Sequence, residues 1–527
     1  MTTQTPRPIP TVSSLVAHHA DAHPDRIAIR FEGRDWRYAE LAACVEKAAA
    51  ALAADGVGRG TRIAYLGKNV GAYFVILYAA ARIGAAMVPI GWRLAPPEVR
   101  YILEDTEAAL LFTDAEHEPV GLALADSIPA LRRVIGLEAQ CASGGLEAYL
   151  ETGASVVPEV VDETSSAFLQ LYTSGTTGHP KGVLLNAVNI FAMRLRCAEA
   201  GIDWDLWDDE EVALVAMPVA HIGGTGYGLM ALFHGATALV AREFSPDAVL
   251  ESIRTERVSK FFIVPTALQI LVRHPDARST DFSRVRHILY GASPMPLALL
   301  REALEVIGAG MVQQYGMTET AGTVVALGAE DHDVAGNERM KSAGKALPGV
   351  ELRIVGDTGE TLGPGEIGEI MVHSEAVMCG YWNQREATAK ALDKSGWLRT
   401  GDAGFLDADG YLFICDRVKD MIVSGGENVY PAEVEAVLYA HPTVAEAAVI
   451  GVPDAKWGEA VKAIIVPRPG AAIDERELIA FARASLAGFK VPKSVDIAAE
   501  LPRNASGKIL KKDLKAPFWS GHDRLVN

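Results

Sequence analysis

The sequence predicts an α/β protein with a large N-terminal domain of parallel α/β sheets, a small β-subdomain and a small α+β C-terminal domain. Helical and β-rich patterns alternate along the first part of the chain, apolar and polar residues alternate near residue 350, and a compact unit with its own strands and helices follows. With 527 residues, the chain is too long for one hydrophobic core of ordinary size. Its hydrophobic content of 49% is enough to fill several such cores.

The N-terminal region shows helical patterns first and strands between helices later. Residues 36–53 carry apolar side chains at helical spacing, and residues 75–90 read as a helix that ends in the strand-like AAMVPI. β-rich runs follow at 212–218, 261–265, 286–290 and 311–315, with helical patterns such as 246–255 and 296–306 between them. This alternation predicts a parallel sheet.

The pattern changes near residue 350, where ELRIVG, GEIGEIMVHS and YLFICDRV alternate apolar and polar residues between Gly/Pro turns. Antiparallel strands with one solvated face have this pattern, so we expect a small β-subdomain. Strands at 445–451 and 460–466 and helices at 431–439 and 475–486 then predict a separate α+β unit. We place the boundary at DRVKD, residues 416–420, which divides the chain into domains 1–416 and 417–527.

Charge and composition exclude several classes of protein. The net charge of −18 would repel nucleic acid and anionic membrane surfaces, so we expect no nucleic-acid partner. Five cysteines without a C-x-x-C pair argue against a disulfide framework or a zinc site. The N-terminus lacks a signal-peptide core, and the most apolar stretch, 72–92, is interrupted by Arg82, Gly84 and Pro89. We therefore expect a cytoplasmic protein without an integral membrane segment.

Residues 172–182, YTSGTTGHPKG, are the most informative stretch of the chain. Hydroxyl donors, glycines that let backbone N–H groups approach an anion, and a lysine together suit a polyphosphate. The residues concerned are Thr173, Ser174, Gly175, Thr176, Thr177, Gly178 and Lys181. The segment is not a Walker A loop, because Pro180 precedes the lysine and a glycine follows it. A Ser/Thr/Gly-rich surface turn is the alternative interpretation.

The order of motifs resembles the adenylate-forming superfamily, which comprises acyl-CoA synthetases, luciferases and peptide-synthetase adenylation domains. The resemblance covers nearly the whole chain. Its motifs are YAEL (38–41), GAAMVP (84–89), YTSGTTGHPKG (172–182), MPVAHIGG (217–224), YGAS (290–293), QQYGMTET (313–320), GEIGEIMV (366–372), GYWN (380–383), WLRTGD (397–402), DRVKDMIVSGGENVYP (416–431) and LPRNASGK (501–508).

The resemblance implies an ATP site. Glu319, preceded by Thr318, would hold Mg²⁺ near the α-phosphate, although a helix-capping glutamate is the simpler interpretation of such a residue alone. Tyr315 would stack on adenine, with Gly291 and Ala292 small enough to let the base lie flat; taken alone, this tyrosine would more often belong to a core.

Three further residues would act on the nucleotide. Asp402 corresponds to a carboxylate that accepts from both ribose hydroxyls, and Arg417 to a guanidinium that orients the ribose and phosphates. A lone aspartate after glycine is otherwise a turn residue. Lys508 would neutralise the charge that develops when the acid's carboxylate attacks the α-phosphate.

The resemblance also implies a second half-reaction, in which CoA attacks the acyl-adenylate after the C-terminal domain has rotated. Lys419 corresponds to the hinge. Gly425 and Gly426 would leave a channel for pantetheine, and Trp457 and Lys493 are weaker candidates for contacts to the CoA nucleotide.

His221 would line the acid pocket beside the reacting carboxylate, although a core histidine is nearly as good an interpretation. The run GGTGYG after it lacks the strand–turn–helix frame of a dinucleotide fingerprint, so we interpret it as a pocket wall. The other candidates for the acid pocket are Gly223, Tyr227, Ser293, Gly316, Met317 and Ala321. The many small residues of this region favour a medium- or long-chain fatty acid, with an aryl or phenylpropenoid acid second.

The resemblance therefore implies an AMP-forming acyl-CoA synthetase that uses ATP, Mg²⁺ and CoA. Because about 20 residues follow Lys508, we expect free CoA rather than a fused carrier domain, while loading of a separate carrier protein stays open. A luciferase-like oxygenase would share these motifs. A non-enzymatic relative should have lost Lys508, Glu319 or the hydroxyl-rich loop, and none is missing. A homodimer stays open.

Overall fold

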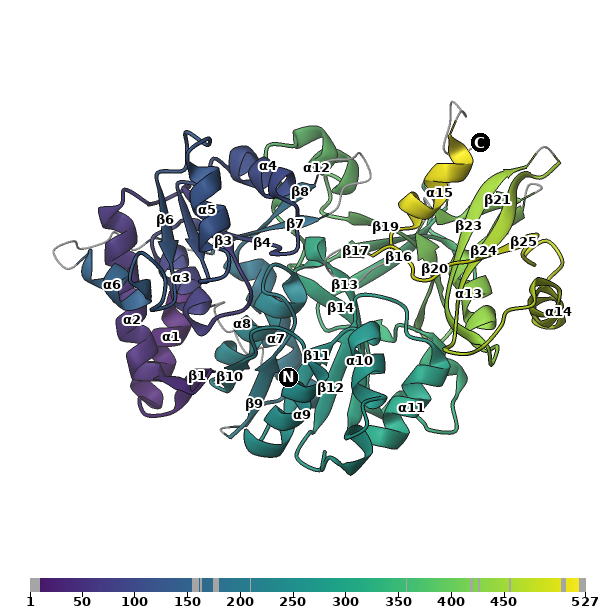
Figure 1. Cartoon of the computed structure of the whole chain (residues 1–527), viewed down its shortest axis with the longest axis horizontal. Coiled ribbons are helices and arrows are strands. Elements are labelled where there is room, and N and C mark those ends of the chain that lie inside the picture. The colour runs from purple at the N-terminus through teal and green to yellow at the C-terminus, as the bar shows by residue number, and fades with distance from the viewer. Residues whose placement is uncertain are drawn as a thin grey trace, which may run out of the picture.

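The computed structural model describes residues 10–153, 161, 164–173, 180–208, 210–356, 358–417, 420–424, 427–454, 456–503 and 509–520. Two large sheets and the helices around them form the N-terminal part of this chain, and a smaller unit lies at the C-terminal end (Figure 1). The α/β class with unequal N- and C-terminal parts is confirmed.

The first sheet has nine strands in the described chain, in the order β15-β14-β13-β12-β11-β9-β10-β1-β2, and is parallel from β13 to β1. These strands are β1 Ile27–Phe31, β2 Arg34–Arg37, β9 Val212–Val215, β10 Thr237–Val240, β11 Lys260–Ile263, β12 His287–Gly291, β13 Gly310–Met317, β14 Gly322–Leu327 and β15 Lys345–Ala346. The parallel sheet expected over 212–315 is therefore confirmed.

The second sheet has seven described strands, in the order β18-β8-β7-β4-β3-β5-β6, and is parallel from β7 to β6. These strands are β3 Arg62–Leu66, β4 Ala86–Ile90, β5 Leu110–Thr113, β6 Arg133–Gly136, β7 Leu169–Thr173, β8 Lys181–Leu185 and β18 Gly380–Tyr381. The helix expected over 36–53 begins later than predicted, because Trp36 and Arg37 complete β2 and pair with β1.

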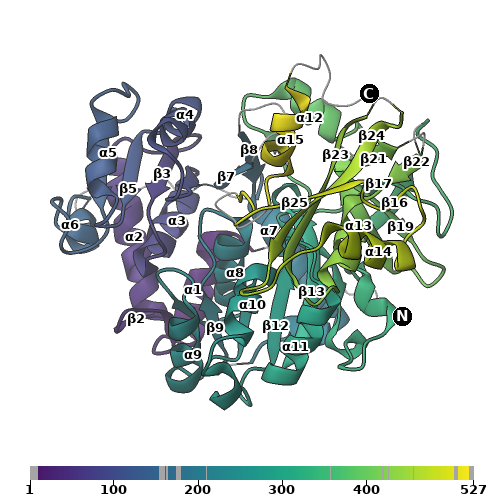
Figure 2. The ribbon, with the colours of Figure 1, turned by 45° about the vertical axis from the view of Figure 1, so that its right-hand side comes forward.

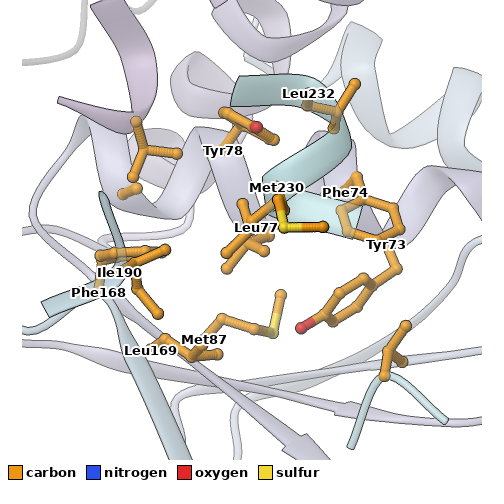
Figure 3. Close-up of a cluster of buried hydrophobic side chains, with 14 of the residues drawn as sticks. Tyr73, Phe74, Leu77, Tyr78, Met87, Phe168, Leu169, Ile190, Met230 and Leu232 are labelled. Carbon is orange, nitrogen blue, oxygen red and sulfur yellow. The ribbon is translucent and has the colours of Figure 1, made fainter. Parts of the chain in front are cut away.

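Helix α3 is buried between the two sheets. Every residue from Gly71 to Ala81 is buried, and α3 contacts β1 of the first sheet and β4 of the second. A helix that is apolar on all sides needs such a position. Its Phe74, Leu77 and Tyr78 form one apolar cluster with Ile190 of α7 and Met230 of α8 (Figure 3).

The helices of the N-terminal part are α1 Val12–Ala22, α2 Tyr38–Ala54, α3 Gly71–Arg82, α4 Pro96–Thr106, α5 Glu118–Ala125, α6 Gly145–Glu151, α7 Ala187–Ala200, α8 Ile222–Phe233, α9 Pro246–Thr255, α10 Pro265–Val272, α11 Leu297–Ile307 and α12 Arg385–Ala391. Two short 3₁₀ helices, η1 Asp203–Asp205 and η3 Thr318–Thr320, matter for the site described below.

The expected β-subdomain is an antiparallel sheet in the order β16-β17-β19-β20, formed by Glu351–Val355, Gly368–His373, Leu398–Leu406 and Leu412–Arg417. The alternating pattern predicted three of these strands. It missed β19, where the buried and exposed residues do not alternate regularly.

The C-terminal unit has its own sheet and apolar core. Its elements are β21 Ile422–Ser424, β22 Glu427–Val429, β23 Val444–Asp454, β24 Gly458–Pro467, β25 Ser494–Ile497, α13 Pro431–Tyr439, α14 Glu475–Ser485 and α15 Lys511–Trp519. Figure 2 shows this unit beside the β-subdomain. Its boundary at 416–420 stays a prediction. None of the described helices is long and apolar enough to cross a membrane.

Candidate active site

A cavity of about 2400 Å³ lies where the N-terminal sheets meet the C-terminal unit. Thr173 at the end of β7 and Met317 at the end of β13 line it, as do residues of α8, α12 and α15. Ligands of α/β proteins bind at the carboxyl ends of parallel strands, so the position fits a binding site.

Tyr315, Asp402 and Arg417 meet in one hydrogen-bonded group. Asp402 and Arg417 are direct partners across β19 and β20, and Arg417 Nε lies 2.8 Å from Asp402 Oδ1. The Tyr315 hydroxyl donates to Asp402 Oδ2 at 2.8 Å. Burial raises the pKa of Tyr315 well above its usual range, and the Asp402 charge adds to this, so the phenol stays protonated. The structure thus brings together three residues that the sequence assigned to the nucleotide.

Glu319 is 6% exposed and held from two sides. Its Oε1 accepts from the Tyr381 hydroxyl at 2.9 Å and lies 3.5 Å from Thr173 Oγ1. Lys181 Nζ lies 4.9 Å from the centre of the Tyr381 ring. Thr173 and Lys181 are direct partners across β7 and β8, so the two ends of the hydroxyl-rich segment lie beside Glu319.

The sequence assigned no role to Tyr381, although it belongs to the GYWN motif at 380–383. Burial raises the pKa of this phenol, and the Glu319 charge adds to the rise. A tyrosine kept in its protonated form donates a hydrogen bond, which here fixes the orientation of the Glu319 carboxylate.

Two glycines of the predicted site are explained by packing. A Cβ at Gly291 would lie 2.2 Å from the carbonyl oxygen of Gln314 on β13, and a Cβ at Gly316 would lie 1.8 Å from that of Gly322. Among the described residues that line the cavity, Gly316 and Ala292 are present but Gly291, Ser293, Tyr315 and Asp402 are not. A direct contact of Gly291 with adenine therefore gains no support from the geometry.

The predicted acid pocket is continuous with this cavity. Its walls include His221, Gly223, Tyr227, Met317 and Ala321, as expected from the sequence. Burial lowers the pKa of His221 to about 4, so the imidazole is neutral at physiological pH.

Helix α7, for which the sequence gave no site residues, supplies Ile190, Phe191 and Arg194 to the same walls. These residues carry no motif. Their helical spacing is that of an ordinary core-facing helix, so sequence alone had no signal that could have singled them out.

Comparison with known proteins identifies the family. Residues 16–382 match the AMP-binding enzyme family, and residues 433–508 match the AMP-binding enzyme C-terminal domain. This chain belongs to the AMP-binding enzyme family. It is an ATP-using, AMP-forming acid–thiol ligase.

The relatives of this AMP-binding enzyme are similar over almost their whole length. A feruloyl-CoA synthase from Amycolatopsis sp is 41% identical over 96% of this chain and 99% of its own. The fatty acid–[acyl-carrier-protein] ligase ScoC from Streptomyces coeruleorubidus is 39% identical over 98% of both chains. Among solved structures, ATP-bound MatB from Rhodopseudomonas palustris is 30% identical, with a TM-score of 0.86 over 97% of this chain and 100% of its own.

Several predicted site residues of the enzyme lie outside the described residues: Ser174, Gly175, Thr176, Thr177, Gly178, Lys419, Gly425, Gly426 and Lys508. Arg503 and Ile509 lie on either side of Lys508 in the sequence. Both line the cavity, and an isolated β-bridge pairs them.

The CoA candidates lie elsewhere. Trp457 is 38% exposed, and Lys493 Nζ donates to the Gly488 carbonyl oxygen at 2.9 Å. Neither is among the described residues that line the cavity.

The described residues contain no group of three or more His, Cys, Asp or Glu side chains that could hold a metal. Mg²⁺ is commonly held by one or two carboxylates together with substrate phosphates and water. The buried carboxylate of Glu319, which is oriented by Tyr381, fits that mode of binding.

Proposed function

We propose that this AMP-binding enzyme activates an apolar carboxylic acid as its acyl-adenylate and transfers the acyl group to the thiol of CoA. The observation that carries the proposal is that one cavity is lined by Arg417, which is bonded to Asp402 and through it to Tyr315, by Glu319, which is bonded to Tyr381, and by His221. Arg417 and its partners suit the ribose and phosphates of the nucleotide, Glu319 suits Mg²⁺, and the pocket beside His221 suits the acid.

In the first half-reaction, an oxygen of the acid bonds to the α-phosphorus of ATP, and the bond to the pyrophosphate oxygen breaks. Asp402, as a carboxylate, would accept from the ribose hydroxyls, and Arg417 would orient the ribose and phosphates. Lys508 would neutralise charge on the attacking oxygen and the phosphate. No general base is required, because the acid is already ionised at neutral pH.

Mg²⁺ would be held by Glu319 and would supply charge neutralisation at the phosphates. Thr318, beside Glu319 in η3, also lines the cavity. The neutral imidazole of His221 would border the carboxylate without adding a charge of its own.

In the second half-reaction, the CoA thiol loses its proton to solvent, its sulfur bonds to the acyl carbon, and AMP leaves with the electrons of the broken bond between the acyl carbon and the phosphate oxygen. The thiol would need the space that Lys508 is proposed to occupy in the first step. Rotation of the C-terminal unit about Lys419 would clear this space, and Gly425 and Gly426 would then border the pantetheine. Trp457 and Lys493, which are both exposed, would contact the CoA nucleotide.

The proposal leaves open two classes of acid substrate and two kinds of thiol acceptor. A medium- or long-chain fatty acid is supported by the similarity to ScoC, and an aryl acid by the similarity to the feruloyl-CoA synthase. ScoC also supports a carrier-protein thiol as the alternative acceptor, because its name gives that acceptor.

The test is to incubate the full chain with ATP, Mg²⁺, CoA and a panel of fatty and aryl acids. We expect pyrophosphate release that depends on the acid, with AMP and an acyl-CoA formed in equal amounts. Formation of ADP and phosphate would overturn the proposal. Pyrophosphate release with thioester appearing only when a phosphopantetheine-bearing carrier protein replaces CoA would favour the alternative acceptor.

A further inference from the structure

Asn69 joins the two large sheets at the edge where their strands end. It lies between β3 of the second sheet and α3, is 2% exposed and lines the cavity. Its Nδ2 donates at 3.0 Å to the carbonyl oxygen of Ala241, which follows β10 of the first sheet. Its main-chain N–H donates at 2.9 Å to the carbonyl oxygen of Arg242. This buried asparagine thus ties the start of α3 to the first sheet.

The same amide holds the segment that carries His221. Residues 217–221, which we call the His221 turn, lie between β9 and α8. Asn69 Nδ2 donates to the Met217 carbonyl oxygen at 3.0 Å, and Asn69 Oδ1 accepts from the Val219 N–H at 2.9 Å. Both hydrogens of the amide and its oxygen are therefore bonded within the protein.

Thr225 and Tyr73 hold the His221 turn from α8 and α3. The Thr225 hydroxyl donates to the Val219 carbonyl oxygen, and the Tyr73 hydroxyl lies 2.8 Å from Thr225 Oγ1. Because Thr225 has a single hydroxyl hydrogen, Tyr73 is the donor in the second bond. Both residues are fully buried. The N–H and the carbonyl of Val219 are therefore each bonded to a buried side chain.

The packing of α8 leaves the His221 turn little room to move. A Cβ at Gly224, in the first turn of α8, would lie 2.2 Å from the Pro218 carbonyl oxygen. The His221 N–H donates to that same oxygen at 3.0 Å, and the His221 carbonyl accepts from the Thr225 N–H at 3.1 Å. The place of the imidazole at the cavity wall thus depends on the conformation of residues 217–221.

We propose that Asn69 is a positioning residue for acid activation, because its amide keeps the His221 turn in the conformation that places the imidazole at the cavity wall. The inference rests on the proposed function, in which His221 borders the carboxylate of the acid. Without the amide, the Met217 carbonyl and the Val219 N–H would lose their partners, and the turn would shift to reach water in the adjacent cavity. A displacement of about 1 Å near reacting groups costs up to about 100-fold in rate.

The first test compares how Asn69→Ala depends on the acid and on ATP. We would measure initial rates of pyrophosphate release while varying either substrate, with dodecanoic and 3-phenylpropenoic acids among the acids of the panel. KM for the acid should rise and kcat/KM for it should fall by at least about tenfold, while KM for ATP stays within about twofold. The reason is that none of the bonds of Asn69 reaches Glu319 or Arg417.

The matched control is Ser259→Ala. Ser259 is also buried, and its hydroxyl is bonded at 3.1 Å to the main chain of Val212, at the opposite end of β9. This variant should keep KM for both substrates. A fall in kcat alone in Asn69→Ala, with KM for the acid unchanged, would overturn the inference and leave the proposed function intact. No acid-dependent pyrophosphate from the unaltered enzyme would overturn both.

The second test asks whether Asn69 acts through His221. If it does, Asn69→Ala should lower kcat/KM for the acid much less in an enzyme that already carries His221→Gln, so that the double variant resembles the weaker single variant. A smaller folded fraction lowers the rate by the same factor in either background, so it cannot produce this result. Losses that multiply would overturn the inference. If Asn69→Ala fails to fold, Asn69→Ser, whose hydroxyl keeps one donor, takes its place in both tests.

Discussion

The nucleotide side and the acid side of the cavity differ in how their polar groups are satisfied. On the nucleotide side, Asp402 is bonded to both Tyr315 and Arg417, and Glu319 is bonded to Tyr381. On the acid side, the Tyr227 hydroxyl has no partner among the described residues, and α7 and α8 contribute mostly apolar walls. The polar side chains on the nucleotide side thus fix one another's orientation, whereas those on the acid side are set among apolar walls.

The difference separates two kinds of mutational effect. A change on the nucleotide side should slow the activation of every acid by the same factor, because ATP is common to all of them. A change on the acid side should alter the ranking of acids. Ratios between acids therefore distinguish the two sides better than absolute rates.

The largest effect is expected at Lys508. Lys508→Ala should lower the rate of adenylate formation by about 10³-fold or more for every acid, since in the proposed mechanism it removes a charge that acts in the transition state. Thioester formation from supplied acyl-adenylate should change little. Acid-dependent exchange of pyrophosphate into ATP measures the first step, and mass spectrometry of the thioester measures the second.

The exposed Lys394 provides the control for loss of a lysine, and Lys394→Ala should leave both half-reactions unchanged. Equal losses in both half-reactions of Lys508→Ala would remove the role assigned to that residue.

Asp402→Asn should lower kcat/KM by about 10- to 100-fold, equally for a fatty and an aryl acid. The amide keeps the shape of the side chain but loses the charge that pairs with Arg417 at 2.8 Å. The measurement is pyrophosphate release with both acids at several ATP concentrations. A change in the ratio between the two acids would contradict the separation of the two sides.

The two sides also differ in how far they were predictable. Asp402, Arg417 and Glu319 lie in motifs whose order along the chain a resemblance could find, before the structure showed that Asp402 and Arg417 are bonded. Arg194, in the middle of α7, and Asp205, at the end of the 3₁₀ helix η1, form an ion pair that nothing in residues 194–205 marks.

The fold shows the same contrast at a larger scale. Alternation of helix and strand predicted the parallel sheet, since each βαβ unit is local in sequence. It could not predict that α3 is enclosed by both sheets, because that depends on how distant segments pack.

His221, where the two sides meet, should make folding stability depend on pH. Burial lowers its pKa in the folded state to about 4, from 6.5 in the unfolded chain. Between these values the unfolded chain binds more protons, so stability is complete above pH 6.5 and falls as the pH drops toward 4. The loss from this group is at most about 3 kcal/mol.

The measurement is the free energy of unfolding in urea between pH 7 and 4.5. His221→Gln should flatten the slope, while the same change at the exposed His18 should preserve it. An equal slope in the enzyme and in His221→Gln would show that this imidazole is not held in its neutral form by burial.

The smallest effect is expected at Tyr381, where Tyr381→Phe removes one hydrogen bond to Glu319. Loss of a bond of about 1 kcal/mol corresponds to roughly a fivefold change, which should appear as a higher Mg²⁺ requirement with equal effect on all acids. The control is Tyr411→Phe, because the Tyr411 hydroxyl also donates to a carboxylate, that of Asp331, at 2.9 Å. Titration of pyrophosphate release with Mg²⁺ should separate the two variants. If both variants titrate alike, the hydrogen bond from Tyr381 to Glu319 does not contribute to the binding of Mg²⁺ and ATP.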